Sequence, residues 1–164
     1  KNKFIITKVY FKLNKKHKVT TNYKSLKNEL ERLGLKNPSS KEIREIVIKI
    51  RNSKLPDPKK LGNAGSFFKN PIINKKQLRM LKSKYSNIPV FKKNEIKIPA
   101  AWLIEQSHWK GYRNKTCGVY ENHSLIIINH KNATGQDIAS LSKKIKKSVY
   151  DKFNITLEEE VLII

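Results

Sequence analysis

A segment rich in glycine and proline, SKLPDPKKLGNAGSFFKNP at Ser53–Pro71, constrains the fold of this chain most strongly. Proline fixes its own backbone φ and disfavours helix in the residue before it. Pro56 and Pro58 therefore exclude a helix across the first half of the segment. Glycine permits a positive φ and a close backbone approach, which we expect at Gly62 and Gly65. The sequence predicts an irregular loop here, and a plain surface turn is the alternative that composition alone favours.

The hydroxyl of Ser66 stands beside two bulky apolar residues. It follows Gly65 and precedes Phe67 and Phe68. Because phenylalanine is usually buried, we expect the pair to hold the hydroxyl at a fixed place on a buried edge. Functional groups are often presented by loops that a rigid scaffold positions, so Ser66 is a candidate for chemistry.

The net charge of +23 raises the question of nucleic-acid binding, because basic proteins neutralise phosphates. Only five of the 36 basic residues are arginine, the residue that favours bidentate phosphate and guanine contacts. The lysines also run the length of the chain instead of clustering. We therefore expect solvated lysines with weak polyanion affinity, and no specific nucleic-acid partner.

The length of 164 residues allows one or two small domains with a true core. No apolar run approaches the roughly 20 residues that span a bilayer, so we expect no membrane partner. The single cysteine, Cys117, cannot form an internal disulfide, which suits a reducing cytoplasm. We interpret it as a small buried residue. The histidines His17, His108 and His130 show no metal-ligand spacing with one another or with Cys117.

Hydrophobic periodicity predicts strands and helices that alternate along the chain, hence an α+β (mixed α/β) fold. Capping boxes at Ser39–Glu42 and Thr134–Asp137 mark the starts of two helices. The expected strands lie at residues 4–13, 66–69, 96–98, 125–128 and 161–164. The expected helices lie at 25–33, 39–52, 75–84 and 100–106, with a long one after Thr134.

Several blocks of sequence resemble a known family and occur in the family's order. They are SKLPDP and GNAGSFFKNP in the loop, PAAWLIEQ at Pro99–Gln106, KGYR at Lys110–Arg113, LIIIN at Leu125–Asn129, NATG at Asn132–Gly135 and KFNITLEEEV at Lys152–Val161. Together they resemble the UDP-N-acetylenolpyruvoylglucosamine reductases (MurB), flavoenzymes of peptidoglycan synthesis. Ordered blocks over nearly the whole chain are far more specific than one short motif.

The resemblance implies a reaction in which NADPH reduces FAD and the reduced flavin delivers hydride to the enolpyruvyl ether of a UDP-sugar. The neighbouring carbon then needs a proton, and Ser66 matches the family's proton donor. Glu160 matches the family's catalytic glutamate, which stands directly before Val161. The family usually has proline between its two glutamates, and Glu159 replaces that proline here.

Four further residues match positions that the resemblance assigns to substrate binding. Lys54 belongs to the KLPDP block, and its ammonium suits a nucleotide diphosphate. Asn70 of KNP matches a hydrogen-bonding residue. Phe91 stands where the family's substrate-covering loop often carries tyrosine. His123 occupies a block that often ends in glutamine, so its role is the weakest of the four.

The resemblance also implies that this chain is a C-terminal half. The chain opens KNKF without methionine and has no GxGxxG dinucleotide fingerprint. We expect residues 1–52 to be the tail of the FAD-binding lobe and residues 53–164 to be the substrate-binding domain, with no cofactor-binding residue in either. The flavin domain is then a missing N-terminal partner, and the chain alone should be inactive. The alternative is a non-catalytic binder of nucleotide-sugars or polyanions.

Overall fold

The computed structural model describes residues 5–13, 15, 21, 23–92 and 94–163. It divides into two compact units, Lys1–Ile50 and Arg51–Ile164. The described residues contain five helices and two small antiparallel sheets, which confirms the predicted α+β class. None of the described helices has both the length and the apolar character that a membrane span requires.

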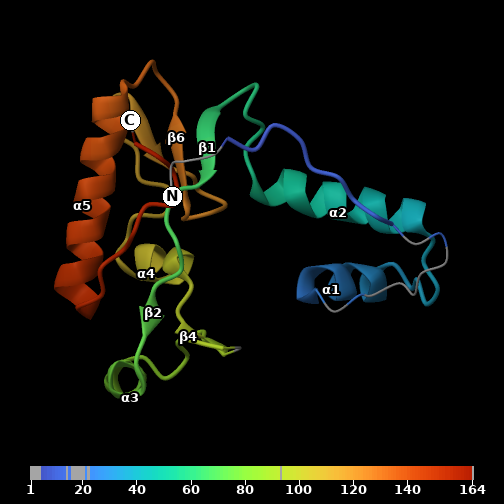
Figure 1. Cartoon of the computed structure of the whole chain (residues 1–164), viewed down its shortest axis with the longest axis horizontal. Helices are drawn as coiled ribbons and strands as arrows, with labels where there is room; N and C mark the ends of the chain where they lie inside the picture. The colour runs from blue at the N-terminus through green and yellow to red at the C-terminus, as the bar shows by residue number, and fades with distance from the viewer. Residues whose placement is uncertain (1–4, 14, 16–20, 22, 93, 164) are drawn as a thin grey trace. The chain divides into compact units, whose positions relative to one another are not determined.

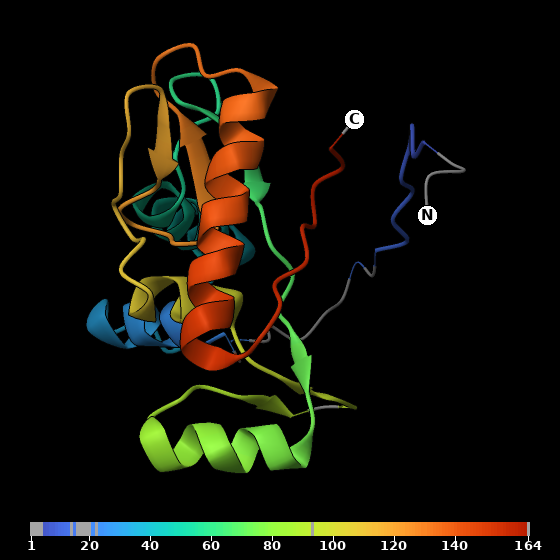
Figure 2. The same cartoon turned by 90° about the vertical axis from the view of Figure 1, so that its left-hand side faces the viewer.

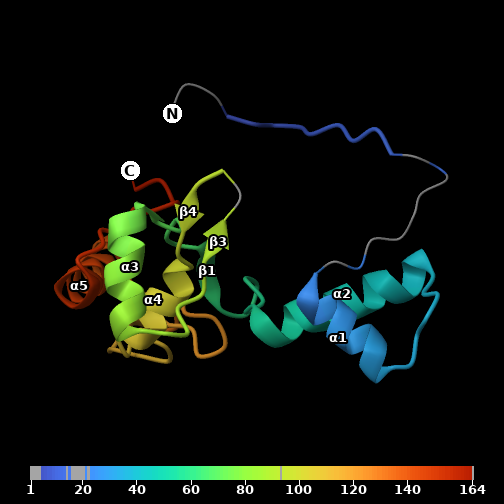
Figure 3. The ribbon, with the colours of Figure 1, turned by 90° about the horizontal axis from the view of Figure 1, so that it is seen from below.

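Two helices that lie side by side form the first unit (Figure 1, Figure 3). They are α1 (Lys24–Arg32) and α2 (Ser40–Lys54), the last turn of which belongs to the second unit. Leu26, Leu30 and Ile46 are buried between them and form a core of their own. The helical periodicity of the sequence therefore located both helices correctly.

The strand expected at residues 4–13 is wrong for the described residues 5–13, which adopt no regular structure. The side chains that were to face a core are exposed, at 91% for Ile5, 65% for Val9 and 79% for Phe11. An alternating pattern predicts a strand only where another strand supplies hydrogen bonds and a surface to cover. No described strand pairs with these residues.

The second unit contains both sheets and the remaining helices. Its elements are β1 (Gly62–Ser66), β2 (Ile72–Ile73), α3 (Lys75–Lys84), β3 (Phe91–Lys92), β4 (Ile96–Lys97), α4 (Ala100–Gln106), β5 (Cys117–Val119), β6 (Ile126–Asn129) and α5 (Gly135–Phe153). One sheet has the order β1-β6-β5 and the other β2-β4-β3. The helix α5 runs along the first sheet, and α3 lies beside the second (Figure 2).

The core of the second unit lies between α5, α4 and the β1-β6-β5 sheet. Leu141, Ile145 and Val149 line the inner face of α5 at helical spacing and are at most 2% exposed. Leu103 on α4 and Ile128 on β6 are fully buried. Cys117 on β5 is fully buried as well, which confirms its interpretation as a core residue.

Both predicted capping boxes are present. The Ser39 backbone N–H donates to Glu42 Oε2 at 2.7 Å, and Glu42 N–H donates back to Ser39 Oγ. Thr134 and Asp137 exchange the same pair of bonds at the start of α5. These bonds satisfy backbone amides that have no partner at the start of a helix. A motif of four residues was therefore enough to predict where each helix begins.

The strands differ more from expectation than the helices do. The strand expected at 66–69 ends at Ser66 and instead begins at Gly62, inside the segment predicted as a loop. Residues 161–163 of the expected terminal strand are not in a strand, and the preceding Glu159 makes only an isolated bridge to Phe68. The short strands β2, β3 and β5 had no signal strong enough to be predicted. Strands depend on partners distant in sequence, which a local pattern does not identify.

Gly118 in β5 gives a test of this packing. An ideal Cβ built there lies 2.3 Å from the Tyr112 carbonyl oxygen, an atom that also accepts the Val119 amide. Gly118→Ala should lower the free energy of unfolding by about 1–3 kcal/mol, because backbone must move to make room. Gly135→Ala is the matched control, since nothing lies within 4 Å of its built Cβ, and it should leave stability unchanged or slightly raised. Equal urea midpoints for both variants would contradict this packing.

Candidate functional site

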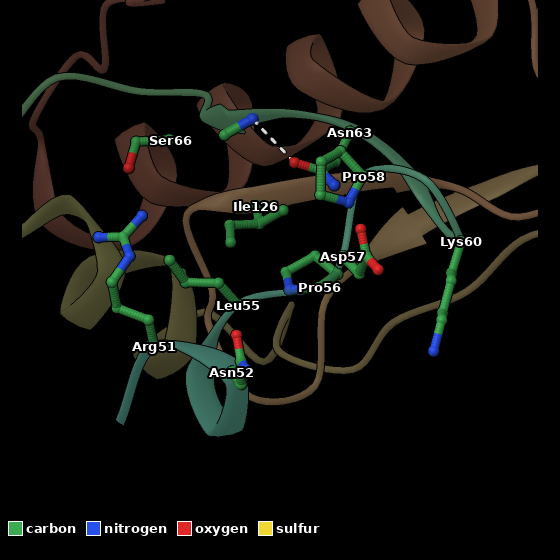
Figure 4. A pocket seen from close by; sticks show the side chains of 11 residues that line it. Arg51, Asn52, Leu55, Pro56, Asp57, Pro58, Lys60, Asn63, Ser66 and Ile126 are labelled. Atoms are coloured by element: carbon green, nitrogen blue, oxygen red, sulfur yellow. Dashed lines mark hydrogen bonds between the residues drawn. The ribbon is translucent and has the colours of Figure 1, made fainter. Parts of the chain in front are cut away.

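A cleft of about 740 Å³ in the second unit is lined mainly by the loop that follows α2 and by the strand β1 (Figure 4). Its lining combines two cations and one acid with apolar and small polar groups. The lining residues are Arg51, Asn52, Leu55, Pro56, Asp57, Pro58, Lys60, Asn63, Gly65, Ser66 and Ile126. Most of them belong to the glycine- and proline-rich segment, so that segment builds the wall of a cleft and is not a plain surface turn.

The first half of the segment leaves α2 through a tight turn centred on Asp57. The Asp57 carboxylate accepts the Lys59 amide at 3.0 Å, and its carbonyl accepts the amides of Lys60 and Leu61. An aspartate that bonds the backbone two residues ahead is a common turn former. Pro56 and Pro58 flank it and keep the chain out of a helix. The turn thus carries the chain from the end of α2 to the start of β1.

A bulge in β1 follows and sets the direction of Ser66. Asn63 bonds the backbone on both sides. Its Nδ2 donates to the Leu61 carbonyl, and its Oδ1 accepts the Gly65 amide, which is the bond drawn in Figure 4. Gly65 has φ of 71°, a conformation that L-residues with side chains rarely adopt. The pairing of β1 with β6 shifts register between Asn63 and Ser66. The conformation of Gly65 therefore decides which way the next residue faces.

Ser66 lies at the end of β1, opposite Ile126, and is exposed to the cleft. Directly behind it, Phe67 is 3% and Phe68 1% exposed, and the Phe67 amide donates to the Leu125 carbonyl at 2.8 Å. The serine is therefore an exposed hydroxyl on a backbone that the core holds fixed. Figure 4 shows it on the same side of the cleft as the end of the Arg51 side chain.

The backbone of Glu160 lies close in space to that of Ser66. Its N–H donates to the carbonyl of Phe67, the residue after Ser66, at 2.9 Å. The side chain is exposed and is not part of the cleft lining. The structure thus brings together the backbones of two predicted catalytic residues that are 94 positions apart in the sequence.

Lys54 and His123 form a second group. His123 is half-buried, and burial lowers its pKa below the ordinary histidine value, with further lowering by the charges of Lys54 and Lys110. Its Nδ1 accepts the Leu125 amide at 3.3 Å, so the neutral ring carries its proton on Nε2 and can donate it. The pair thus combines a cation with a neutral hydrogen-bond donor.

Asn70 has a structural contact that the sequence did not suggest. Its Oδ1 accepts the Ala100 amide at 2.8 Å, at the start of α4, where the N-cap residue Pro99 has no side chain that could cap. The Asn70 side-chain NH₂ is the part of the side chain suited to a ligand.

Phe91 lies in β3 and is 56% exposed.

Of the six predicted site residues, Ser66 alone lines the cleft. Two charged lining residues, Arg51 and Asp57, were not predicted as site residues, and Lys60 was interpreted as a solvated lysine. Arg51 was predicted as part of a helix, and the cleft begins where that helix ends. The proximity of Pro56 was the available signal, because a helix must end before it and expose its last turn. Among the described residues no three His, Cys, Asp or Glu side chains gather as a metal site.

Comparisons with known proteins identify the family of this chain. The family model described as "UDP-N-acetylenolpyruvoylglucosamine reductase, C-terminal domain" matches residues 57–164. Proteins named UDP-N-acetylenolpyruvoylglucosamine reductase from Flavobacterium johnsoniae and Amoebophilus asiaticus are 44% and 45% identical over the whole chain, which covers 50% and 49% of their lengths. One from Porphyromonas gingivalis W83 is 42% identical over 93% of the chain and 46% of its own length.

The chain therefore spans about half the length of the curated relatives it matches. The match covers the cleft-forming turn from Asp57, the bulge at Gly65, Ser66 and the C-terminal segment with Glu160. On this match, the chain belongs to the UDP-N-acetylenolpyruvoylglucosamine reductase family.

Proposed function

We propose that this chain is the substrate-binding part of an enzyme that reduces UDP-N-acetylglucosamine enolpyruvate to UDP-N-acetylmuramate in peptidoglycan synthesis. The placement of Ser66 carries the proposal: an exposed hydroxyl on a rigid bulge, at the edge of a cleft that also holds Arg51. Family membership supports the substrate class.

Reduced flavin, regenerated by NADPH, supplies the hydride for this reaction. Hydride addition to one carbon of the enolpyruvyl double bond leaves electron density on the neighbouring carbon and on the carboxylate. Ser66 then gives its hydroxyl proton to that carbon, and a solvent proton restores the hydroxyl. A serine hydroxyl is a weak acid, so it acts only where it is held against a strongly basic carbon. The burial of Phe67 and Phe68 supports this role, because it holds the backbone of Ser66 in place.

The glycine-rich segment does not fit a dinucleotide site of the strand–turn–helix type. Such sites place a glycine-rich turn between a strand and the start of a helix, where amides meet the pyrophosphate. Here Gly62 and Gly65 lie within β1, which follows the end of α2. The proposed FAD site therefore lies in a flavin-binding part beyond these residues, as the partner that this chain needs for activity.

Arg51 is proposed to bind an anionic group of the substrate, either the diphosphate or the carboxylate. An arginine guanidinium suits both because its donors form a planar fork. Arg51→Met in a reductase that contains this chain should raise KM for the UDP-sugar about 10–100-fold, as expected for losing a hydrogen bond to a charged group. Arg44→Met, an exposed arginine earlier on α2, is the matched control. Similar KM values for the two variants would remove Arg51 from this role.

The whole proposal is tested by measuring flavin and activity together. The chain alone should bind no FAD and oxidise no NADPH. Combined with a flavin-binding part, it should oxidise NADPH over many turnovers only when UDP-N-acetylglucosamine enolpyruvate is present. A yellow, flavin-retaining preparation of the isolated chain would contradict the proposal that a separate part binds FAD. A combined enzyme whose NADPH oxidation did not depend on that substrate would contradict the proposed function.

A further inference from the structure

The C-terminal segment after α5 returns along the core to Ser66. Asn154 ends α5 with a φ of 53°, which reverses the chain. Ile155 and Leu157 then pack into the core at 4% and 0% exposure. Glu159 next forms an antiparallel bridge to Phe68. The segment therefore lies against the backbone that holds the predicted proton donor.

Two backbone hydrogen bonds join the segment to the chain beyond Ser66. Lys69 N–H donates to the Glu158 carbonyl, and Glu160 N–H donates to the Phe67 carbonyl, both at 2.9 Å. The Lys69 ammonium also forms an ion pair with the exposed Glu158 carboxylate. Two hydrogen bonds in an isolated bridge are weak by themselves, because a short edge pairing frays easily.

A three-residue contact ties the same segment to α5. The Glu159 carboxylate accepts two hydrogen bonds from Lys146 Nζ, at 2.8 and 3.0 Å, and one from Ser142 Oγ at 2.9 Å. Ser142 is fully buried, and the side chains of Lys146 and Glu159 are 32% and 20% exposed. Burial raises the pKa of Glu159, but the bonds from Lys146, the backbone and Ser142 outweigh it and lower the pKa below its ordinary value. The Glu159 carboxylate is therefore ionised near neutral pH, and the contact of Ser142, Lys146 and Glu159 forms an anchor between the segment and α5.

The anchor acts next to Glu160, because Glu160 directly follows Glu159 in the chain. Glu159 is held on α5 by its side chain, so the backbone that leads into Glu160 is held there as well. The bridge joins this backbone to the site, since Glu160 N–H donates to the carbonyl of Phe67, the residue after Ser66. Fixing Glu159 therefore helps to hold the backbone of Glu160 next to that of Ser66.

We propose that Glu159, held by Lys146 and Ser142, is a positioning residue that sets Glu160 beside Ser66 for the reaction. The proposal rests on the proposed function for the role of Glu160, but its structural part stands on the contacts alone. Glu159 touches neither the cleft nor a reacting atom, so it acts through its neighbour. Charge-assisted hydrogen bonds in a partly buried place are stronger and more directional than neutral ones, which suits them to this task.

Amide hydrogen exchange of the 164-residue chain tests the structural part. Lys146→Met and Glu159→Gln should each speed exchange of the Glu160 and Lys69 amides about tenfold, because the bridge opens more often. The amides of Ile145 and Val149, within α5, should change less than twofold. Lys147→Met is the matched control: it removes an exposed ion pair with Asp151 from the same helix without touching the segment. Unchanged Glu160 exchange in Lys146→Met, or an equal change in Lys147→Met, would overturn the proposal.

Flavin reoxidation by the substrate, in a reductase that contains this chain, tests the functional part. Glu159→Gln and Lys146→Met should each lower its limiting rate about tenfold with KM changed less than twofold. The reversed pair, Lys146→Glu with Glu159→Lys, should recover part of that rate, because the Ser142 hydroxyl can accept as well as donate. Wild-type rates of flavin reoxidation in both single variants would contradict the proposed positioning role of Glu159. If Glu160→Gln left the rate of flavin reoxidation unchanged, Glu160 would not have its proposed role, whatever the hydrogen-exchange results are.

Discussion

Ser66→Ala, in a reductase that contains this chain, should slow reoxidation of the reduced flavin by substrate about 10²–10⁴-fold, the usual contribution of a positioned general acid. Reduction of the flavin by NADPH should stay within twofold of wild type, because Ser66 is proposed to act only on the substrate carbon. Stopped-flow measurement of the two half-reactions separates the effects.

The structure supplies a control for the loss of the hydroxyl itself. Ser83→Ala removes an exposed hydroxyl on α3 that donates to the Met80 carbonyl at 2.8 Å. It should leave both half-reactions unchanged. If Ser66→Ala reoxidised as fast as Ser83→Ala, the proton would have to come from another group. In that event the rigid bulge at Gly65 would have no catalytic purpose.

The second large effect concerns stability. Phe68→Ala should lower the free energy of unfolding by about 3–5 kcal/mol, the range for truncating a buried phenylalanine. Phe68 is 1% exposed, meets Phe67 edge to face with ring centroids 5.2 Å apart, and bridges to Glu159. Truncation leaves a cavity behind the backbone of Ser66. Urea unfolding of the second unit, followed by tryptophan fluorescence, measures the change.

Phe91→Ala is the matched control for this substitution. Phe91 is 56% exposed in β3, so its truncation should lower the free energy of unfolding by less than about 1 kcal/mol. The same variant also tests the predicted substrate contact, which would appear as a higher KM in the reductase. A loss of stability at Phe91 as large as that at Phe68 would contradict the description of the core.

The helices were predictable from sequence because their determinants are local. The expected ranges 75–84 and 100–106 match α3 and α4, and the capping boxes at Ser39 and Thr134 form as predicted. A helix satisfies its backbone within a few residues, and its buried face repeats every three to four positions. These signals do not depend on what the rest of the chain does.

The strands and the cleft were less predictable because they depend on distant partners. The alternating residues 5–13 have no described partner strand and do not form a strand themselves. Gly62 and Gly65, although typical of loops, lie in β1 because β6 pairs with Gly62 and with Ser66 on either side of the bulge. The contact between Asn70 and α4 likewise joins residues 30 positions apart. No local pattern contains such pairings.

The sequence by itself determined the α+β class, the helices, the family and the candidate proton donor Ser66, since all of these are contained in local periodicity and ordered motifs. Tertiary structure alone decided that the glycine-rich segment is a strand with a bulge, that Arg51 shares its cleft, and that Glu159 binds α5 beside Glu160. The physical reason is separation along the chain. Residues 13 to 94 positions apart meet only when the core forms, because burial of Phe68, Leu157 and the inner face of α5 is what brings them together.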